Sequence, residues 1–223
     1  MIHSKILNNI PGIQHGFGTR FDAAPPNTHL LQQVHGKKVV VIRRGDEAPV
    51  IESKGDSPKA DAWVTNDPSL IIGIKTADCV PILLYDPVQK GVAAVHAGWK
   101  GSLANISGEV VKIMQEEFYS KPSDLVAAIG PAVGFHCYEV GSDVADHFKK
   151  EFGEDRQVLQ KFGRKFLLDT QAVNRRQLHE AGLLPEKIEI LSYCTHCRSD
   201  LLHSVRRDGD EAGRQVSWVE LLG

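Results

Sequence analysis

The chain contains 223 residues, of which 42% are hydrophobic and 24% are charged, and its 26 Lys and Arg residues nearly balance its 28 Asp and Glu residues. At this length a folded chain buries roughly 70–75% of the surface that its unfolded form exposes, so a hydrophobic core can form without a disulfide or a structural metal. The balanced charge disfavours nucleic acid and anionic membranes as partners, and no apolar run approaches the ~20 residues of a membrane helix. The N-terminal residues lack the pattern of a secretory signal, so we expect a single cytoplasmic domain over residues 1–223.

Short β-rich runs alternate with loops in the first half of the chain. Consecutive rather than alternating apolar positions are typical of strands that are covered on both faces. We expect such strands at residues 39–42, 62–65, 70–74, 80–85 and 92–95. Between the first two, residues 43–59 are rich in charge, Gly and Pro, which predicts a long surface loop.

Helical periodicity begins after the last of these strands. Apolar residues spaced three and four apart predict an amphipathic helix over about 103–118, with Ser102 as its N-cap. Two further helices are expected over 143–152 and from an N-cap at Asp169 to Gly182. Interleaved strands and helices, together with hairpin-like spacing between Trp63 and His96, favour an α+β fold with mixed rather than purely parallel sheets.

Three loops concentrate reactive side chains beside glycines, at residues 32–36, 76–79 and 96–101. His96 follows an apolar strand and precedes a helix N-terminus, where free backbone N–H groups favour an anion such as phosphate. Lys100 would add a positive charge there. The alternative is an ordinary strand-to-helix turn in which His96 bonds a backbone carbonyl.

Cys79, taken alone, is typical of a buried and inert thiol. Together with His35 and His96, however, it supplies the ligand types of a catalytic zinc site, whose fourth position stays open for water or substrate. Zinc in such a site would lower the pKa of bound water toward about 7, and Asp78 would either carry a proton or orient a ligand. The three ligands lie 44 and 17 positions apart along the chain, so only the fold can bring them together.

The C-terminal third contains a second group of reactive residues. Cys194 and Cys197 are separated by two residues and precede His203. They could form half of a structural zinc site, but the second pair is missing, and no helix begins after them as a thioredoxin-like motif requires. The pattern therefore favours ordinary thiols, whereas Arg206 and Arg207 would form either an anion clamp or a surface salt-bridge turn.

Several of these motifs together resemble the YfiH/YlmD-like family, whose members have been called multicopper polyphenol oxidases, laccase-domain proteins and purine nucleoside phosphorylases. The matching segments are Gln33–Gly36, Thr76–Cys79, His96–Gly101, Gly130–Gly134, Cys137–Val140 and Arg206–Gly209. The resemblance implies a layered α/β/β/α sandwich with mixed β-sheets and a metal held by His35, Cys79 and His96. It also implies a zinc-dependent purine nucleoside phosphorylase acting on adenosine, inosine and methylthioadenosine with phosphate, with adenosine deaminase activity.

The same resemblance adds Arg20, from the opening motif Gly16–Arg20, to the candidates for substrate binding beside Lys100 and Arg206. Cys79, His96 and Asp78 are the candidate catalytic residues. We expect a purine nucleoside and phosphate as small-molecule partners, and a monomer or a weak homo-oligomer.

Three other classes of function compete with this prediction. A multicopper oxidase needs on the order of ten histidines, many in His-x-His pairs, whereas this chain has ten in total and no such pair. A metal-free cysteine hydrolase or deamidase would use Cys79 as nucleophile and His96 as base, which leaves His35 without a role. A binding protein with structural zinc would need four protein ligands, and the family motif supplies three.

Overall fold

The computed structural model describes residues 1–47 and 57–223 of the chain. Most of the surface loop predicted over 43–59 lies outside the described residues, although residues 43–47 are exposed as expected. No helix within the described ranges is long and apolar enough to cross a membrane.

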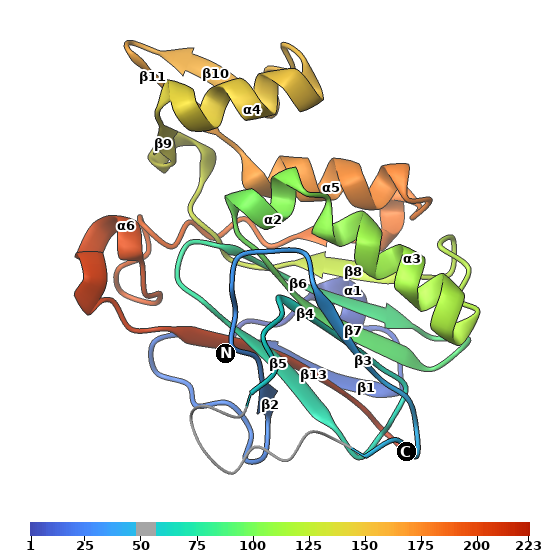
Figure 1. The fold of residues 1–223 in the computed structure, drawn as a ribbon. Coiled ribbons are helices and arrows are strands. Elements are labelled where there is room, and N and C mark those ends of the chain that lie inside the picture. The colour runs from blue at the N-terminus through green and yellow to red at the C-terminus, as the bar shows by residue number, and fades with distance from the viewer. Residues whose placement is uncertain (48–56) are drawn as a thin grey trace.

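Two mixed β-sheets form the body of the molecule (Figure 1). The larger has the strand order β12-β8-β6-β7-β4-β3, with bounds Ile188–Ile190, Val126–Ile129, Val80–Asp86, Gly91–Ala97, Ala62–Thr65 and Val39–Ile42. The smaller has the order β1-β13-β5-β2, with bounds Ile13–Phe17, Gln215–Leu221, Ile71–Thr76 and His29–Leu30. Both contain parallel and antiparallel pairs, so the expected mixed sheets are confirmed.

The six-stranded sheet is covered on both faces, as the continuous apolar runs predict. On one face, Ile82 and Leu84 of β6 join the core beneath helices α3 (Ile106–Phe118) and α5 (Thr170–Glu180). On the other, Leu83 and Tyr85 pack with residues of the four-stranded sheet. Every residue of β6 is buried, which explains why its sequence shows no polar alternation.

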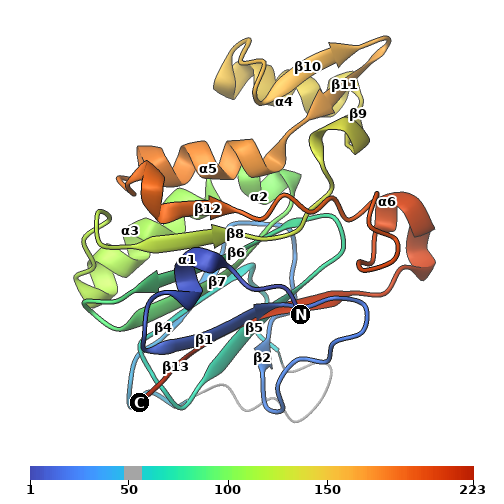
Figure 2. The same cartoon turned by 180° about the vertical axis from the view of Figure 1, so that it is seen from behind.

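A smaller unit stands apart from the two sheets (Figure 2). It consists of helix α4 (Ser142–Phe152) and a three-stranded antiparallel sheet of β9 (Glu139–Val140), β10 (Leu159–Phe162) and β11 (Lys165–Leu168). Its apolar cluster contains the buried Phe148 and extends to Val173 of α5. The remaining elements are short: α1 (Lys5–Asn8), α2 (Trp99–Leu103), α6 (Val205–Asp208), η1 (Phe135–Cys137), η2 (Pro185–Lys187) and η3 (Gly209–Glu211).

The predicted helix over 103–118 is wrong at its start. The chain forms the short helix α2, breaks, and begins α3 at Ile106, with Asn105 in the left-handed conformation at φ +58°. The Asn105 side chain accepts a hydrogen bond from the Gly108 N–H at 3.1 Å and is therefore the true N-cap. Ser102 is instead fully buried, and its Oγ accepts a hydrogen bond from Asn174.

The other predicted elements agree closely with the structure. The five predicted strands correspond to β3 to β7, and α4 lies within one residue of the prediction. Helix α5 begins after Asp169, whose carboxylate accepts from the Ala172 N–H at 2.9 Å. Its end is followed by Gly182 at φ +103°, a conformation that favours glycine.

Strand register brings several loops to one edge of the six-stranded sheet. Val39 of β3 is paired with Ala62 of β4, and Ala62 with Val95 of β7. On the other side of β7, Ala97 is paired with Val80 of β6. The loops that precede β3, β4 and β6 therefore meet the end of β7.

Candidate metal centre and substrate cavity

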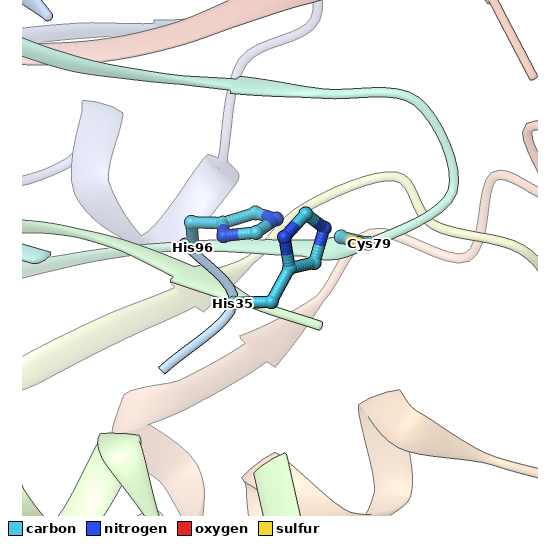
Figure 3. A group of neighbouring side chains, drawn as sticks. All are labelled: His35, Cys79 and His96. Carbon is cyan, nitrogen blue, oxygen red and sulfur yellow. The ribbon is translucent and has the colours of Figure 1, made fainter. Parts of the chain in front are cut away.

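His35, Cys79 and His96 point toward one another at this edge of the sheet (Figure 3). One ligand atom from each residue lies within 4.8 Å of the ligand atoms of the other two. The imidazole rings of His35 and His96 meet edge to face, with centroids 4.8 Å apart. The structure thus brings together the three residues that the sequence analysis selected as metal ligands.

A buried carboxylate that the sequence analysis missed lies behind the two histidines. Asp61, which precedes β4, is fully buried, and its Oδ1 accepts from His96 Nδ1 at 2.8 Å. The same oxygen accepts from the backbone N–H of His35 at 2.9 Å, and Oδ2 accepts from Gly36 N–H at 2.7 Å. In its neutral form, His96 donates Nδ1–H to Asp61 and presents the lone pair of Nε2 to the centre, an arrangement that orients metal-binding histidines in proteins.

Backbone strain accompanies this convergence. His35 has φ +58° and Asp78 has φ +93°, values that cost non-glycine residues energy and that cluster at functional sites. Gly98 has to be small for a different reason: a Cβ there would lie 3.0 Å from His35 Cδ2 and 3.2 Å from Cys79 Sγ. Glycine at this position therefore lets the chain turn directly beside the three candidate ligands.

Contacts within the site shift the pKa values of Cys79 and His96 in opposite directions. Burial by itself raises the pKa of the Cys79 thiol, but hydrogen bonds and charge from His35 and His96 outweigh burial and lower this pKa to about 6. Burial lowers the pKa of His96, but hydrogen bonds to Asp61 and Cys79 raise it to about 9. In the absence of a metal, the pair therefore carries a thiolate beside an imidazolium at neutral pH.

The three residues line a cavity of about 820 Å³. Its wall also includes aromatic and cationic side chains from several elements, namely Trp99, Tyr138, Lys75, Arg206 and Arg214. The Arg206 guanidinium lies over the Tyr138 ring, 5.3 Å from its centroid. This volume lies within the ~300–1,000 Å³ typical of small-molecule sites.

The Asp78 carboxylate joins two segments beside this cavity through hydrogen bonds. Its Oδ1 accepts from Thr195 Oγ1 at 2.5 Å, and its Oδ2 accepts from the backbone N–H of Arg206 at 2.6 Å. Both oxygens are therefore engaged, which favours an orienting role for Asp78 over that of a proton carrier.

Two of the three predicted substrate-binding cations do not line the cavity. The Arg20 guanidinium donates to the backbone carbonyl of Ser199, and the Lys100 ammonium lies 5.5 Å from the centroid of the Trp99 ring. Both are exposed. Arg20 is held by a segment 179 residues away along the chain, whereas Lys100 lies over the ring of the preceding residue. Arg206 does line the cavity. The Arg207 guanidinium instead donates hydrogen bonds to the backbone carbonyls of Thr195, His196 and Leu202.

Comparison with known proteins agrees with this architecture. The model of a family described as multi-copper polyphenol oxidoreductase laccase matches residues 13–222. The chain belongs to this family. The resemblance to YfiH/YlmD-like proteins that the motifs carry is thereby confirmed.

Individual relatives cover most of the chain. "Purine nucleoside phosphorylase YlmD" of Bacillus subtilis is 34% identical over 85% of this chain and 69% of its own length. "Adenosine deaminase RL5" of an unknown prokaryotic organism is 35% identical over 85% and 73%, respectively. Among solved structures, the YfiH protein of Bacillus licheniformis is similar with a TM-score of 0.84 and 29% identity, covering 94% of this chain and 93% of that one.

Proposed function

We propose that this chain is a zinc-dependent purine nucleoside phosphorylase that acts on adenosine, inosine and methylthioadenosine with phosphate and also deaminates adenosine. The names of the curated relatives support an enzyme of this kind. The observation that carries the proposal is the convergence of His35, Cys79 and His96 on a cavity of nucleoside size.

The donor set fits zinc. Two imidazoles and one thiolate are ligands that zinc prefers, and three protein ligands with an open fourth position are typical of catalytic rather than structural sites. Asp61 fixes the tautomer of His96 through Nδ1, and the lowered pKa of Cys79 supplies the thiolate. When bound, zinc would provide Lewis acidity at the reacting atoms.

The donor set does not fit a multicopper centre, despite the family's description. The described residues hold two His/Cys groups of three residues each, with three histidines among them. Four coppers require on the order of ten histidines. We therefore derive no copper chemistry for this chain.

The cavity wall can recognise both substrates. A guanidinium binds phosphate through paired, charge-assisted hydrogen bonds, and Arg206 lines the cavity with Arg214 and Lys75 nearby. The rings of Trp99 and Tyr138 offer apolar faces for a purine, and stacking of a base on an aromatic ring contributes about 1–3 kcal/mol.

In phosphorolysis, a phosphate oxygen bonds to the anomeric carbon of ribose while the bond from that carbon to the base nitrogen breaks. The base leaves with the electron pair and takes up a proton. Arg206 would hold the attacking phosphate, and Asp78 would hold the Arg206 backbone in place through its N–H. In deamination, water adds at C6 of the purine and ammonia leaves.

One observation favours a second candidate function. The Cys79 thiolate beside protonated His96 is also the nucleophile and acid–base pair of a metal-free cysteine hydrolase or deamidase. In that case Cys79 would react with thiol reagents in the purified, metal-free protein, and His35 would be dispensable.

Metal analysis and product analysis together test the proposal. Purified protein is incubated with adenosine and phosphate under zinc-replete conditions, and adenine, inosine and hypoxanthine are measured chromatographically. We expect these products from the wild type and from the control His136→Gln, since His136 is exposed and lies outside the site. In His35→Gln and Cys79→Ser, we expect the zinc at this centre to be lost and the products to disappear with it. Absence of product from the zinc-loaded wild type would overturn the proposed reaction, and a fully active His35→Gln variant would favour the cysteine hydrolase.

A further inference from the structure

Three cysteines and one histidine gather outside the proposed active centre. Cys137 ends η1, whereas Cys194, His196 and Cys197 lie on one turn after β12. One ligand atom each from Cys137, His196 and Cys197 lies within 4.8 Å of the other two. The sulfurs of Cys137 and Cys197 are 3.4 Å apart, and all four cysteines of the chain are free.

The fold supplies the third sulfur that the sequence analysis lacked. From the sequence alone, Cys194 and Cys197 could be half of a zinc site without a second pair, and the pattern favours ordinary thiols. In the structure, Cys137 meets this half-site from a segment about 60 residues away, and the histidine of the group is His196 rather than the predicted neighbour His203.

Cys194 lies beside this group, and a backbone donor holds its sulfur. The Gly134 N–H donates to Cys194 Sγ at 3.1 Å. A Cβ at Gly134 would lie 3.1 Å from Cys194 Cβ and 3.2 Å from its sulfur, so glycine permits the close approach of these two segments.

We propose that Cys137, His196 and Cys197 form a second metal site, which takes a thiophilic divalent ion such as Zn²⁺, and that Cys194, which lies outside the group of ligand atoms within 4.8 Å of one another, moves in as the fourth donor when the ion binds. Zinc–sulfur bonds of about 2.3 Å and zinc–nitrogen bonds of about 2.0 Å place tetrahedral ligands roughly 3.5–3.8 Å apart. The 3.4 Å between the Cys137 and Cys197 sulfurs is close to this separation. Four donors of this kind make a closed, structural site, and binding releases the thiol protons.

The second site would stabilise the wall of the first. Thr195 lies between the two cysteines of the turn, and its Oγ1 donates to Asp78 Oδ1 at 2.5 Å. Arg207 Nη1 donates to the carbonyls of Thr195 and His196 at 2.7 and 3.1 Å. An ion in the second site would therefore hold the turn that positions Asp78, the residue before Cys79.

Metal stoichiometry of separate and combined variants tests this site. Wild type, Cys79→Ser, Cys197→Ser and the double variant are purified, reconstituted with zinc, freed of excess metal and analysed by mass spectrometry of the elements. We expect about two zinc ions per wild-type chain, about one in each single variant and none in the double variant. Cys197 is exposed, so its substitution leaves the core intact, and circular dichroism checks the fold.

Cobalt gives an independent signature. Sulfur-to-cobalt charge-transfer absorption should persist in Cys79→Ser, because the second site keeps its thiolates, and should weaken in Cys79→Ser combined with His196→Gln. The matched control is His136→Gln, a neighbouring exposed histidine outside the group, which should retain two ions. A single wild-type ion that is lost completely in Cys79→Ser would overturn the proposal. So would a Cys137–Cys197 disulfide, seen as a mass lower by two hydrogens, in protein purified under reducing conditions.

Discussion

Replacement of Asp61 by Asn tests the role of the buried carboxylate behind the metal ligands. The Asp61 oxygens accept three hydrogen bonds, two at Oδ1 from His96 Nδ1 and His35 N–H, and one at Oδ2 from Gly36 N–H. An amide whose oxygen takes the Oδ1 position keeps the first two bonds. Its NH2 group then faces the Gly36 N–H, so one half-buried donor loses its acceptor.

The expected losses of folding stability and of zinc affinity follow from these contacts. An unsatisfied buried N–H costs about 1–3 kcal/mol of folding free energy. Loss of a carboxylate that orients a metal-binding histidine weakens metal binding by about 10–100-fold, which corresponds to about 1.4–2.7 kcal/mol. We therefore expect Asp61→Asn to fold, to bind zinc more weakly and to regain part of its activity when zinc is in excess.

Competition with a chromogenic chelator measures the zinc affinity, and urea denaturation measures the stability. The matched control is Asp86→Asn, because Asp86 is equally buried but lies at the other end of β6. Its Oδ1 accepts both of its bonds, from Val88 and Gln89, so an amide oxygen can replace it. The reasoning is refuted if Asp61→Asn binds zinc as tightly as the wild type, or if both variants lose the same affinity.

Other predictions concern phosphate, helix capping and pH. Arg206→Gln removes a guanidinium from the cavity wall. Because the loss of a charge-assisted hydrogen bond costs about 1.5–3 kcal/mol, KM for phosphate should rise roughly 10–100-fold in initial-rate assays. An unchanged KM would contradict the assignment of Arg206 to phosphate binding. Asn105→Ala removes the cap of α3 and puts alanine at φ +58°; urea denaturation should show a loss of about 1–2 kcal/mol, and only a few tenths for Asn105→Gly. Burial, and next the charge of His3, lower the pKa of His15 from 6.5 to about 4. The unfolded chain therefore takes up this proton first, and stability that is complete above about pH 6.5 should fall by up to about 3 kcal/mol by pH 4. His15→Gln should flatten this slope in denaturation measured across that range.

Local sequence predicted the elements whose boundaries depend on local chemistry. The strand over residues 80–85 is apolar at nearly every position, and burial on both faces is the only arrangement that hides such a run from water. The cap at Asp169 follows from a carboxylate at the start of an apolar period. The helix start at Ile106 was missed because α2 ends at its C-cap Ala104 and Asn105 then caps α3 in the left-handed conformation. The periodicity of the apolar face does not predict this break.

The candidate site likewise has features that the local sequence predicts and features that depend on the tertiary structure. The sequence by itself determined which side chains can hold a metal, since softness and donor type belong to each residue, and so it selected His35, Cys79 and His96. Only the tertiary structure decided which groups lie beside them. Strand register places Asp61 behind His96. The Arg20 guanidinium donates to the backbone carbonyl of Ser199, which lies 179 residues away along the chain, whereas the Lys100 ammonium lies over the ring of its neighbour Trp99.

The cysteines show this division most clearly. Their number and reactivity are read from the sequence, which left Cys194 and Cys197 as an incomplete pair. The fold brings the sulfur of Cys137 to 3.4 Å from that of Cys197 and keeps Cys79 with the two histidines. The physical reason is that metal binding depends on separations of a few ångströms, and these are set by sheet pairing and loop contacts between residues that lie far apart along the chain.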